Sequence, residues 1–216
     1  YLCSDAAHNI SGQIFGSGYF SVQTANTGYL KTDGIDFAAN YMSDLVDLGL
    51  PDDGSLSVSF MGTYLSSYVT QPLPGLGTYD CAGYYGPTCG TANPEWRHRM
   101  RVTWDTPWDL SISVNWRYFG AVNIDANSPD PDLGGGPGTY TKYDKNISAY
   151  NWFDLAVTYD MFKNLELRAG VNNIMGIDPP ATDTNNSPLP YGNGNTFPGQ
   201  YDYLGRTVFF NATVKL

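Results

Sequence analysis

Two cysteines that lie eight positions apart are the residues whose types and spacing most clearly predict a chemical bond or a metal site. Cys81 and Cys89 lie in a stretch rich in Gly, Pro and Tyr, and this pattern predicts a small disulfide-closed loop in an oxidising compartment. A zinc site is the alternative, but two thiols and the distant His8 and His98 make a poor set of four ligands. The third thiol, Cys3, has no neighbour of its kind, and we expect its partner to lie in sequence upstream of this chain.

Arginine occupies three alternate positions between residues 97 and 101, and single arginines stand at polar positions of two other stretches in which apolar and polar residues alternate. Because alternate side chains of a β-strand point to the same face, we predict that five arginines share one face of a β-sheet, which is the interior face if the sheet closes into a barrel: Arg97, Arg99, Arg101, Arg117 and Arg168. Such a row could attract an anionic ligand. The ordinary interpretation is that these arginines pair with acidic residues of neighbouring strands, for which the candidates are Asp36, Asp154 and Glu166.

The remaining polar residues predict neither catalysis nor a metal centre. His8 and His98 are far apart, and no Gly-x-Ser-x-Gly turn is present to expose a nucleophile. The acidic stretch 125–132 offers oxygen ligands for Ca²⁺ but lacks the spacing and the closing Glu of an EF-hand, so we predict a solvated loop there. We expect no enzyme activity, no metal and no cofactor.

The composition restricts the class of protein in which these residues are placed. Only 15% of the 216 residues are charged, 15% are aromatic, and the net charge is −10, whereas ordinary soluble domains contain about 25% charged residues. An acidic chain is a poor partner for nucleic acid, and no apolar run of 18 residues is present to form a membrane-spanning helix. A chain low in charge but not rich in apolar residues fits strands that have one polar face.

Apolar and polar residues alternate with a period of two along most of the chain. The pattern is clearest in residues 110–118, where Leu110, Ile112 and Val114 alternate with serines and Asn115. The alternation predicts about eight antiparallel strands, near residues 13–23, 35–42, 55–64, 99–104, 110–118, 153–159, 165–172 and 206–216. The first of these is weakened by glycines.

The connections between these strands predict a membrane barrel. Short connections at 47–54, 105–108 and 160–164 alternate with long ones, rich in Gly, Pro and Asn, at about 71–94, 120–147 and 175–202. Short turns at one rim and long loops at the other are typical of outer-membrane barrels. We also expect two aromatic girdles, one near the short turns (Trp104, Trp108, Phe162) and one toward the long loops (Tyr64, Tyr68, Tyr118, Tyr150, Trp152). A soluble β-sandwich is the alternative, because its strands alternate in the same way.

A series of short motifs adds a family resemblance. The most specific are Gly-Val-Asn-Asn at 170–173, Asp-Pro-Pro at 178–180 and Tyr-Asp-x-Leu-Gly-Arg at 201–206, and segments 26–36, 93–97 and 115–118 accompany them. In this order they resemble the C-terminal barrel region of TonB-dependent outer-membrane receptors. The resemblance implies that residues 1–216 are about the last eight strands of a 22-stranded type of antiparallel transmembrane barrel. The plug domain and the N-terminal strands would lie outside this sequence.

The resemblance also implies a function and a set of partners. The expected function is energy-coupled uptake of a scarce solute (a siderophore, a vitamin or a carbohydrate) across the outer membrane of a Gram-negative bacterium. The expected partners are outer-membrane lipid, a small-molecule substrate, a TonB-type protein that acts through the plug, and the barrel-insertion machinery, with no nucleic acid. The insertion signal would be the apolar row of the last strand, Phe210, Ala212, Val214 and Leu216, although Leu216 stands where the family usually has Phe. A plug carboxylate is then a further candidate partner for the arginine row.

Two functions from other classes remain open at this point. One is a free-standing small outer-membrane barrel with a structural or adhesive role, since eight strands can close on side chains alone. The other is a secreted β-sandwich that acts as a binding module. The identity of the solute is not predicted by any motif in the long loops.

Overall fold

One antiparallel sheet is the main element of the computed structural model, which describes residues 6–7, 19–20, 28–49, 54–134, 142–187 and 189–215. Within these ranges its seven long strands are β3 (Tyr29–Asp44), β4 (Ser55–Gln71), β7 (Trp96–Asp105), β8 (Leu110–Phe119), β11 (Tyr150–Phe162), β12 (Leu165–Asn172) and β13 (Thr207–Val214). The short β5 (Tyr79–Asp80) pairs with β4. The described helical residues form two 3-10 turns, η1 (Leu45–Leu48) and η2 (Asp125–Asn127). The prediction of an all-β antiparallel fold is confirmed.

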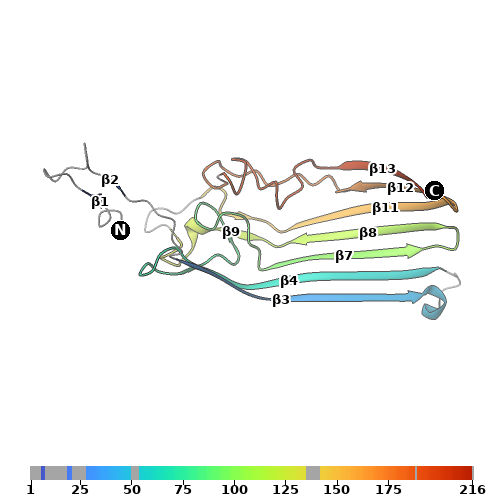
Figure 1. The fold of residues 1–216 in the computed structure, drawn as a ribbon, viewed down its shortest axis with the longest axis horizontal. Helices are drawn as coiled ribbons and strands as arrows, with labels where there is room; N and C mark the ends of the chain where they lie inside the picture. Colours follow the sequence, from blue (N-terminus) through green and yellow to red (C-terminus); the bar gives the residue numbers. More distant parts are fainter. Residues whose placement is uncertain are drawn as a thin grey trace.

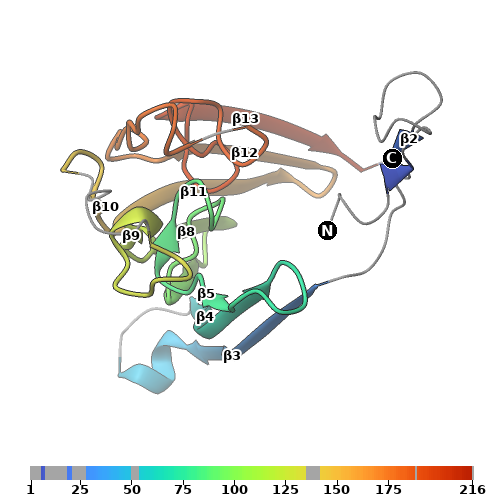
Figure 2. The same cartoon turned by 90° about the vertical axis from the view of Figure 1, so that its left-hand side faces the viewer.

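The long strands follow one another across the sheet in the order in which they occur in the chain. Each pairs antiparallel with the next, from β3 at one edge to β13 at the other (Figure 1). Viewed from the loop end, the sheet is curved (Figure 2), and in the described residues β3 and β13 are not paired with each other. The sheet is therefore a curved, open wall. None of the described helices is long and apolar enough to span a membrane.

The strand register gives this wall two chemically different faces. On the apolar face, Val58, Val102 and Val114 are cross-strand neighbours on β4, β7 and β8. Several members of this face are more than 45% exposed, namely Ile35, Phe37, Tyr41, Val208 and Phe210. The opposite, polar face contains the intervening residues, among them Asp36, Thr63, Asn115 and the arginines of β7, β8 and β12. An apolar area of this extent in contact with water is unusual, whereas it is ordinary next to lipid.

The connections alternate between short and long, as predicted. Residues 45–54, 106–109 and 163–164 form the short ones at one end, and residues 72–95, 120–149 and 173–206 form the long ones at the other (Figure 1). The predicted strand at 13–23 lies outside the described residues except for β2 (Tyr19–Phe20), which pairs with β1 (Ala6–Ala7). Cys3, His8 and Leu216 also lie outside them.

The long loops pack into a small core of their own at the end of the sheet. There β6 (Tyr84–Tyr85), β9 (Val122–Ile124) and β10 (Asn146–Ile147) form a three-stranded sheet. The buried cluster around it consists of Tyr85, Ala92, Phe119, Val122, Ile124, Ile147, Trp152, Phe197 and Tyr201. Because Trp152 is only 3% exposed in this cluster, its predicted place in an aromatic girdle is wrong. The register puts it opposite Arg117 on the polar face, under the loops.

Candidate functional site

The polar face of the sheet carries most of its cationic side chains. Five of the six arginines of the chain, the five predicted from their alternation, lie on this face. Arg99 is the cross-strand neighbour of Arg117, and Arg101 is the neighbour of Asn115. The register confirms that the five arginines share one face. That this face points toward the interior of a closed barrel stays a prediction.

Arg117 joins two distant parts of the chain through a pair of carboxylates. Its Nε and Nη2 donate hydrogen bonds of 2.9 Å to the two oxygens of Asp154 on β11. Its Nη1 and Nη2 donate to the two oxygens of Asp202 in the last long loop, at 2.9 and 2.6 Å. Both pairs therefore have the bidentate geometry in which a guanidinium binds carboxylate most strongly. Asp154 also accepts hydrogen bonds from the side chain of Asn115 and from the amide of Asn173.

The loop segment beside Asp202 is anchored by aromatic packing. Tyr201 is 2% exposed, and its ring lies edge-on against Phe119, Tyr150 and Trp152 at centroid distances of 5.2, 5.0 and 6.0 Å. Trp152 in turn lies under the guanidinium carbon of Arg117, 5.3 Å from its ring centroid. The ion pair and the ring cluster together hold the segment 197–202 across the polar face.

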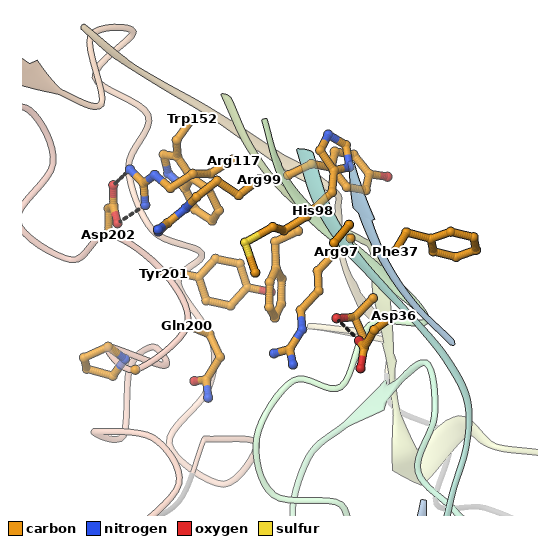
Figure 3. Close-up of a pocket in the computed structure, with 18 residues that line it drawn as sticks. Asp36, Phe37, Arg97, His98, Arg99, Arg117, Trp152, Gln200, Tyr201 and Asp202 are labelled. Atoms are coloured by element: carbon orange, nitrogen blue, oxygen red, sulfur yellow. Dashed lines mark hydrogen bonds and ion pairs between the residues drawn. The ribbon is translucent and has the colours of Figure 1, made fainter. Parts of the chain in front are cut away.

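A cleft of about 770 Å³ separates this segment from the strands. Its charged lining consists of Asp36, Arg97, Arg99, Arg117 and Asp202, with Trp152, Gln200 and Tyr201 beside them (Figure 3). The volume falls within the range of about 300–1,000 Å³ that is usual for small-molecule sites. This cleft is the candidate functional site of the described part of the chain.

The predicted pairing of the arginines holds for one of them. Arg117 pairs with Asp154 as expected and, in addition, with Asp202. Asp36 instead accepts a hydrogen bond from Thr63 at 2.8 Å, and Arg168 lies over the ring of Phe209 at 5.8 Å. Within the described ranges, Arg97, Arg99 and Arg101 have no ion pair.

Sequence reasoning missed Gln200, Tyr201 and Asp202 of this site. Tyr201 and Asp202 belong to the Tyr-Asp-x-Leu-Gly-Arg motif, which contributed only to the family resemblance. The signal that could have assigned them is the placement of an acidic residue next to an aromatic one in a long loop of otherwise low charge.

The predicted disulfide between Cys81 and Cys89 is present, and a buried carboxylate organises the loop that it closes. Asp125, which is 1% exposed, accepts hydrogen bonds from the amides of Thr88 and Cys89 at 2.7 and 2.8 Å. The prediction of a solvated acidic loop is therefore wrong for this residue. Among the described residues, no three His, Cys, Asp or Glu side chains are grouped as a metal site.

Replacement of Asp125 tests its role in this loop. We expect Asp125→Ala to destabilise the loop by about 1–2 kcal/mol, since the Cys89 amide loses its acceptor while water can reach the more exposed Thr88. Asp125→Asn retains an oxygen that can accept both bonds and serves as the matched control. Hydrogen exchange at the Cys89 amide, followed by mass spectrometry, measures the difference, and equal protection in both variants would contradict the assigned role.

A prediction about pH follows for two of these proteins, the natural chain and Asp125→Asn. Burial raises the pKa of Asp125 above its ordinary value of 3.8, although its amide hydrogen bonds oppose this. Because its pKa is raised, the folded loop favours the protonated form of Asp125. The protonated side chain therefore stabilises the loop at low pH, and this stabilisation is lost as the pH rises through the raised pKa. Asn resembles the protonated form at every pH. The stability of Asp125→Asn relative to the natural loop should therefore increase between pH 4 and pH 7.

Comparison with known protein families identifies one match. The model described as "TonB dependent receptor-like, beta-barrel" matches residues 5–174, a span that includes β3 through β12. No curated protein and no solved structure matches the chain significantly.

Proposed function

Because the chain belongs to the TonB-dependent receptor-like β-barrel family, we propose that it forms part of the wall of an outer-membrane receptor that imports a scarce solute by energy-coupled transport. The solute would be a siderophore, a vitamin or a carbohydrate. The family is one of receptors and transporters, so we propose no catalytic role for any residue of the cleft.

The observation that carries this proposal is the division of the sheet into two faces. The apolar face leaves Phe37, Val208 and Phe210 between 47% and 76% exposed, as a lipid-facing wall requires. The polar face holds the arginines and the cleft beneath the long loops. This arrangement supports a membrane wall over a soluble sandwich, whose two sheets would cover each other's apolar faces.

The unpaired edges of the sheet support a barrel larger than the described part. In those residues neither β3 nor β13 has a second long neighbour, and an exposed strand edge promotes aggregation unless another strand covers it. We therefore propose that residues 1–216 are the C-terminal portion of a 22-stranded type of barrel and not a free-standing small barrel. Further strands and a plug would be supplied by the rest of the receptor.

The remaining partners follow from the same proposal. Outer-membrane lipid would contact the apolar face, and a TonB-type protein would deliver energy through the plug. The barrel-insertion machinery would recognise β13, on which Phe210 and Val214 are 66% and 59% exposed. The five arginines would face the interior of the barrel of a Gram-negative outer membrane.

Uptake by cells tests this function. A strain that lacks the complete receptor should leave at least one scarce solute in a defined medium that the parent strain removes, as measured by mass spectrometry of the medium. Dissipating the inner-membrane proton gradient should abolish the difference, because the transport is energy-coupled. If no solute differs between the strains, or if the difference persists without the gradient, energy-coupled uptake is not the function.

A further inference from the structure

The described residues of the long loops lie together at one end of the sheet (Figure 1). In chain order, the first, second and third long loops are residues 72–95, 120–149 and 173–206. The first two share backbone pairing, because β6 of the first loop runs parallel to β9 of the second. They are joined again by Asp125 of the second loop, which accepts hydrogen bonds from the amides of Thr88 and Cys89. The disulfide between Cys81 and Cys89 closes the first loop at the same place.

The third loop contacts both of the others. The ring of Phe197 meets the ring of Tyr85, in the first loop, edge-on at a centroid distance of 5.8 Å, and both side chains are fully buried. Toward the second loop, the amide of Asp183 donates a hydrogen bond of 2.6 Å to the carboxylate of Asp144. Every pair of long loops is therefore in direct contact.

Asp144 is a residue at which all three loops meet. Its carbonyl oxygen accepts a hydrogen bond from the hydroxyl of Tyr85 in the first loop. Its carboxylate accepts hydrogen bonds from the amide of Asp183 and the side chain of Asn186 in the third loop. The backbone of Asp144 has a φ of 54°, a left-handed conformation that is uncommon outside glycine but is tolerated by Asp and Asn. In this conformation the carbonyl and the carboxylate reach different loops.

These shared contacts make the three loops depend on one another. Proteins open locally in cooperative units, and a segment opens alone only where few contacts join it to its neighbours. A long loop that left this assembly alone would break its contacts with both of the others. It would also expose the buried cluster, which contains one residue from each loop in Tyr85, Ile124 and Phe197.

We propose that the three long loops form one cooperative cap, which opens and closes as a unit, and that Asp144 couples the third loop to the other two. The disulfide then stabilises the whole cap and not only the loop that it closes. This inference goes beyond the proposed function and does not depend on it, because it concerns only the contacts among the described residues of the loops.

Hydrogen exchange in the complete receptor, purified in detergent and followed by mass spectrometry, tests this coupling. Joint replacement of Cys81 and Cys89 by serine removes the disulfide of the first loop. The amide of Gly83, which donates within the first loop, and that of Thr182, which donates within the third, should both exchange at least about tenfold faster. The amide of Thr106, in a short connection at the opposite end of the sheet, should keep its rate.

Asp144→Gly is a milder second variant, since glycine readily adopts the left-handed backbone and only the carboxylate is lost. It should accelerate exchange at both Gly83 and Thr182 by at least about fivefold, as expected for the loss of hydrogen bonds to a charged group. Tyr143→Gly is the matched control, because it makes the same substitution one position earlier at a side chain that is 83% exposed. It should change either rate less than twofold.

The loops open independently, and the proposal is overturned, if the cysteine variant accelerates the amide of Gly83 alone or neither amide. Equal acceleration of the Thr106 amide would also overturn it, because the cooperative unit would then be the whole protein. Exchange in Asp144→Gly that is no faster than in Tyr143→Gly would contradict the coupling assigned to Asp144. This last comparison is decisive by itself if the cysteine variant does not fold.

Discussion

Replacement of Arg117 by methionine is expected to release the loop segment 197–202 from the sheet. The two carboxylates that share this guanidinium, those of Asp154 and Asp202, would then face each other without the cation that binds them both. Removal of one partner of a buried ion pair costs about 3–5 kcal/mol. These side chains are 15–28% exposed, so water screens part of the repulsion, and we expect about 2–3 kcal/mol here.

Hydrogen exchange reports this release directly. The amide of Tyr201 donates to the carbonyl of Phe197 within the segment, and its exchange should become at least about 30-fold faster in Arg117→Met, because 1.4 kcal/mol corresponds to a factor of ten. Arg101→Met removes an arginine from the same face without an ion pair and should leave this amide unchanged. Asp154→Asn combined with Asp202→Asn in the Arg117→Met background should restore part of the protection. Unchanged exchange in Arg117→Met would show that the aromatic packing of Tyr201 alone holds the segment.

The wall of the structure could be predicted from the sequence because a strand imposes a period of two on every residue it contains. The alternation of Leu110, Ile112 and Val114 with polar residues was sufficient to assign β8 and its two faces. Long and short connections were predictable for a similar reason, since Gly, Pro and Asn accumulate between strands. The bounds of the strands were underestimated, most clearly for β3, which begins at Tyr29 instead of near Ile35.

The contents of the long loops could not be predicted in this way. The contact between Arg117 and Asp202 joins residues 85 positions apart, and no periodic pattern links an irregular loop to the strand that it covers. Asp125 illustrates the same limit. An acidic residue in a Pro-rich stretch is usually solvated, whereas here the side chain is buried against a disulfide-closed loop and accepts hydrogen bonds from the amides of that loop. Trp152 was placed in a girdle because it occurs near a strand end, and only the register with β8 reveals that it faces the loops.

A second large effect is expected on the opposite face of the sheet, at the centre of β8. Val114 is the cross-strand neighbour of Val102 and Leu155 and is 41% exposed on the apolar face. If this face contacts the hydrocarbon of a membrane, Val114→Arg should destabilise the folded protein by about 2–4 kcal/mol, the cost of an arginine near the bilayer midplane of a β-barrel. On a surface in contact with water, the same substitution would change stability by no more than about 0.5 kcal/mol.

The adjacent residue supplies the matched control for this substitution. Ser113 lies on the polar face, next to Thr103 and Ala156, so Ser113→Arg adds the same charge one position away in contact with the interior. Urea unfolding of the complete receptor from lipid vesicles should show a loss of stability for Val114→Arg that is at least about 1.4 kcal/mol larger, a factor of ten in the folding equilibrium. Equal stability of the two variants would mean that the two faces meet the same solvent. The membrane wall, and with it the proposed transport function, would then be untenable, because the two positions lie on opposite faces of the same strand at the same depth in the sheet.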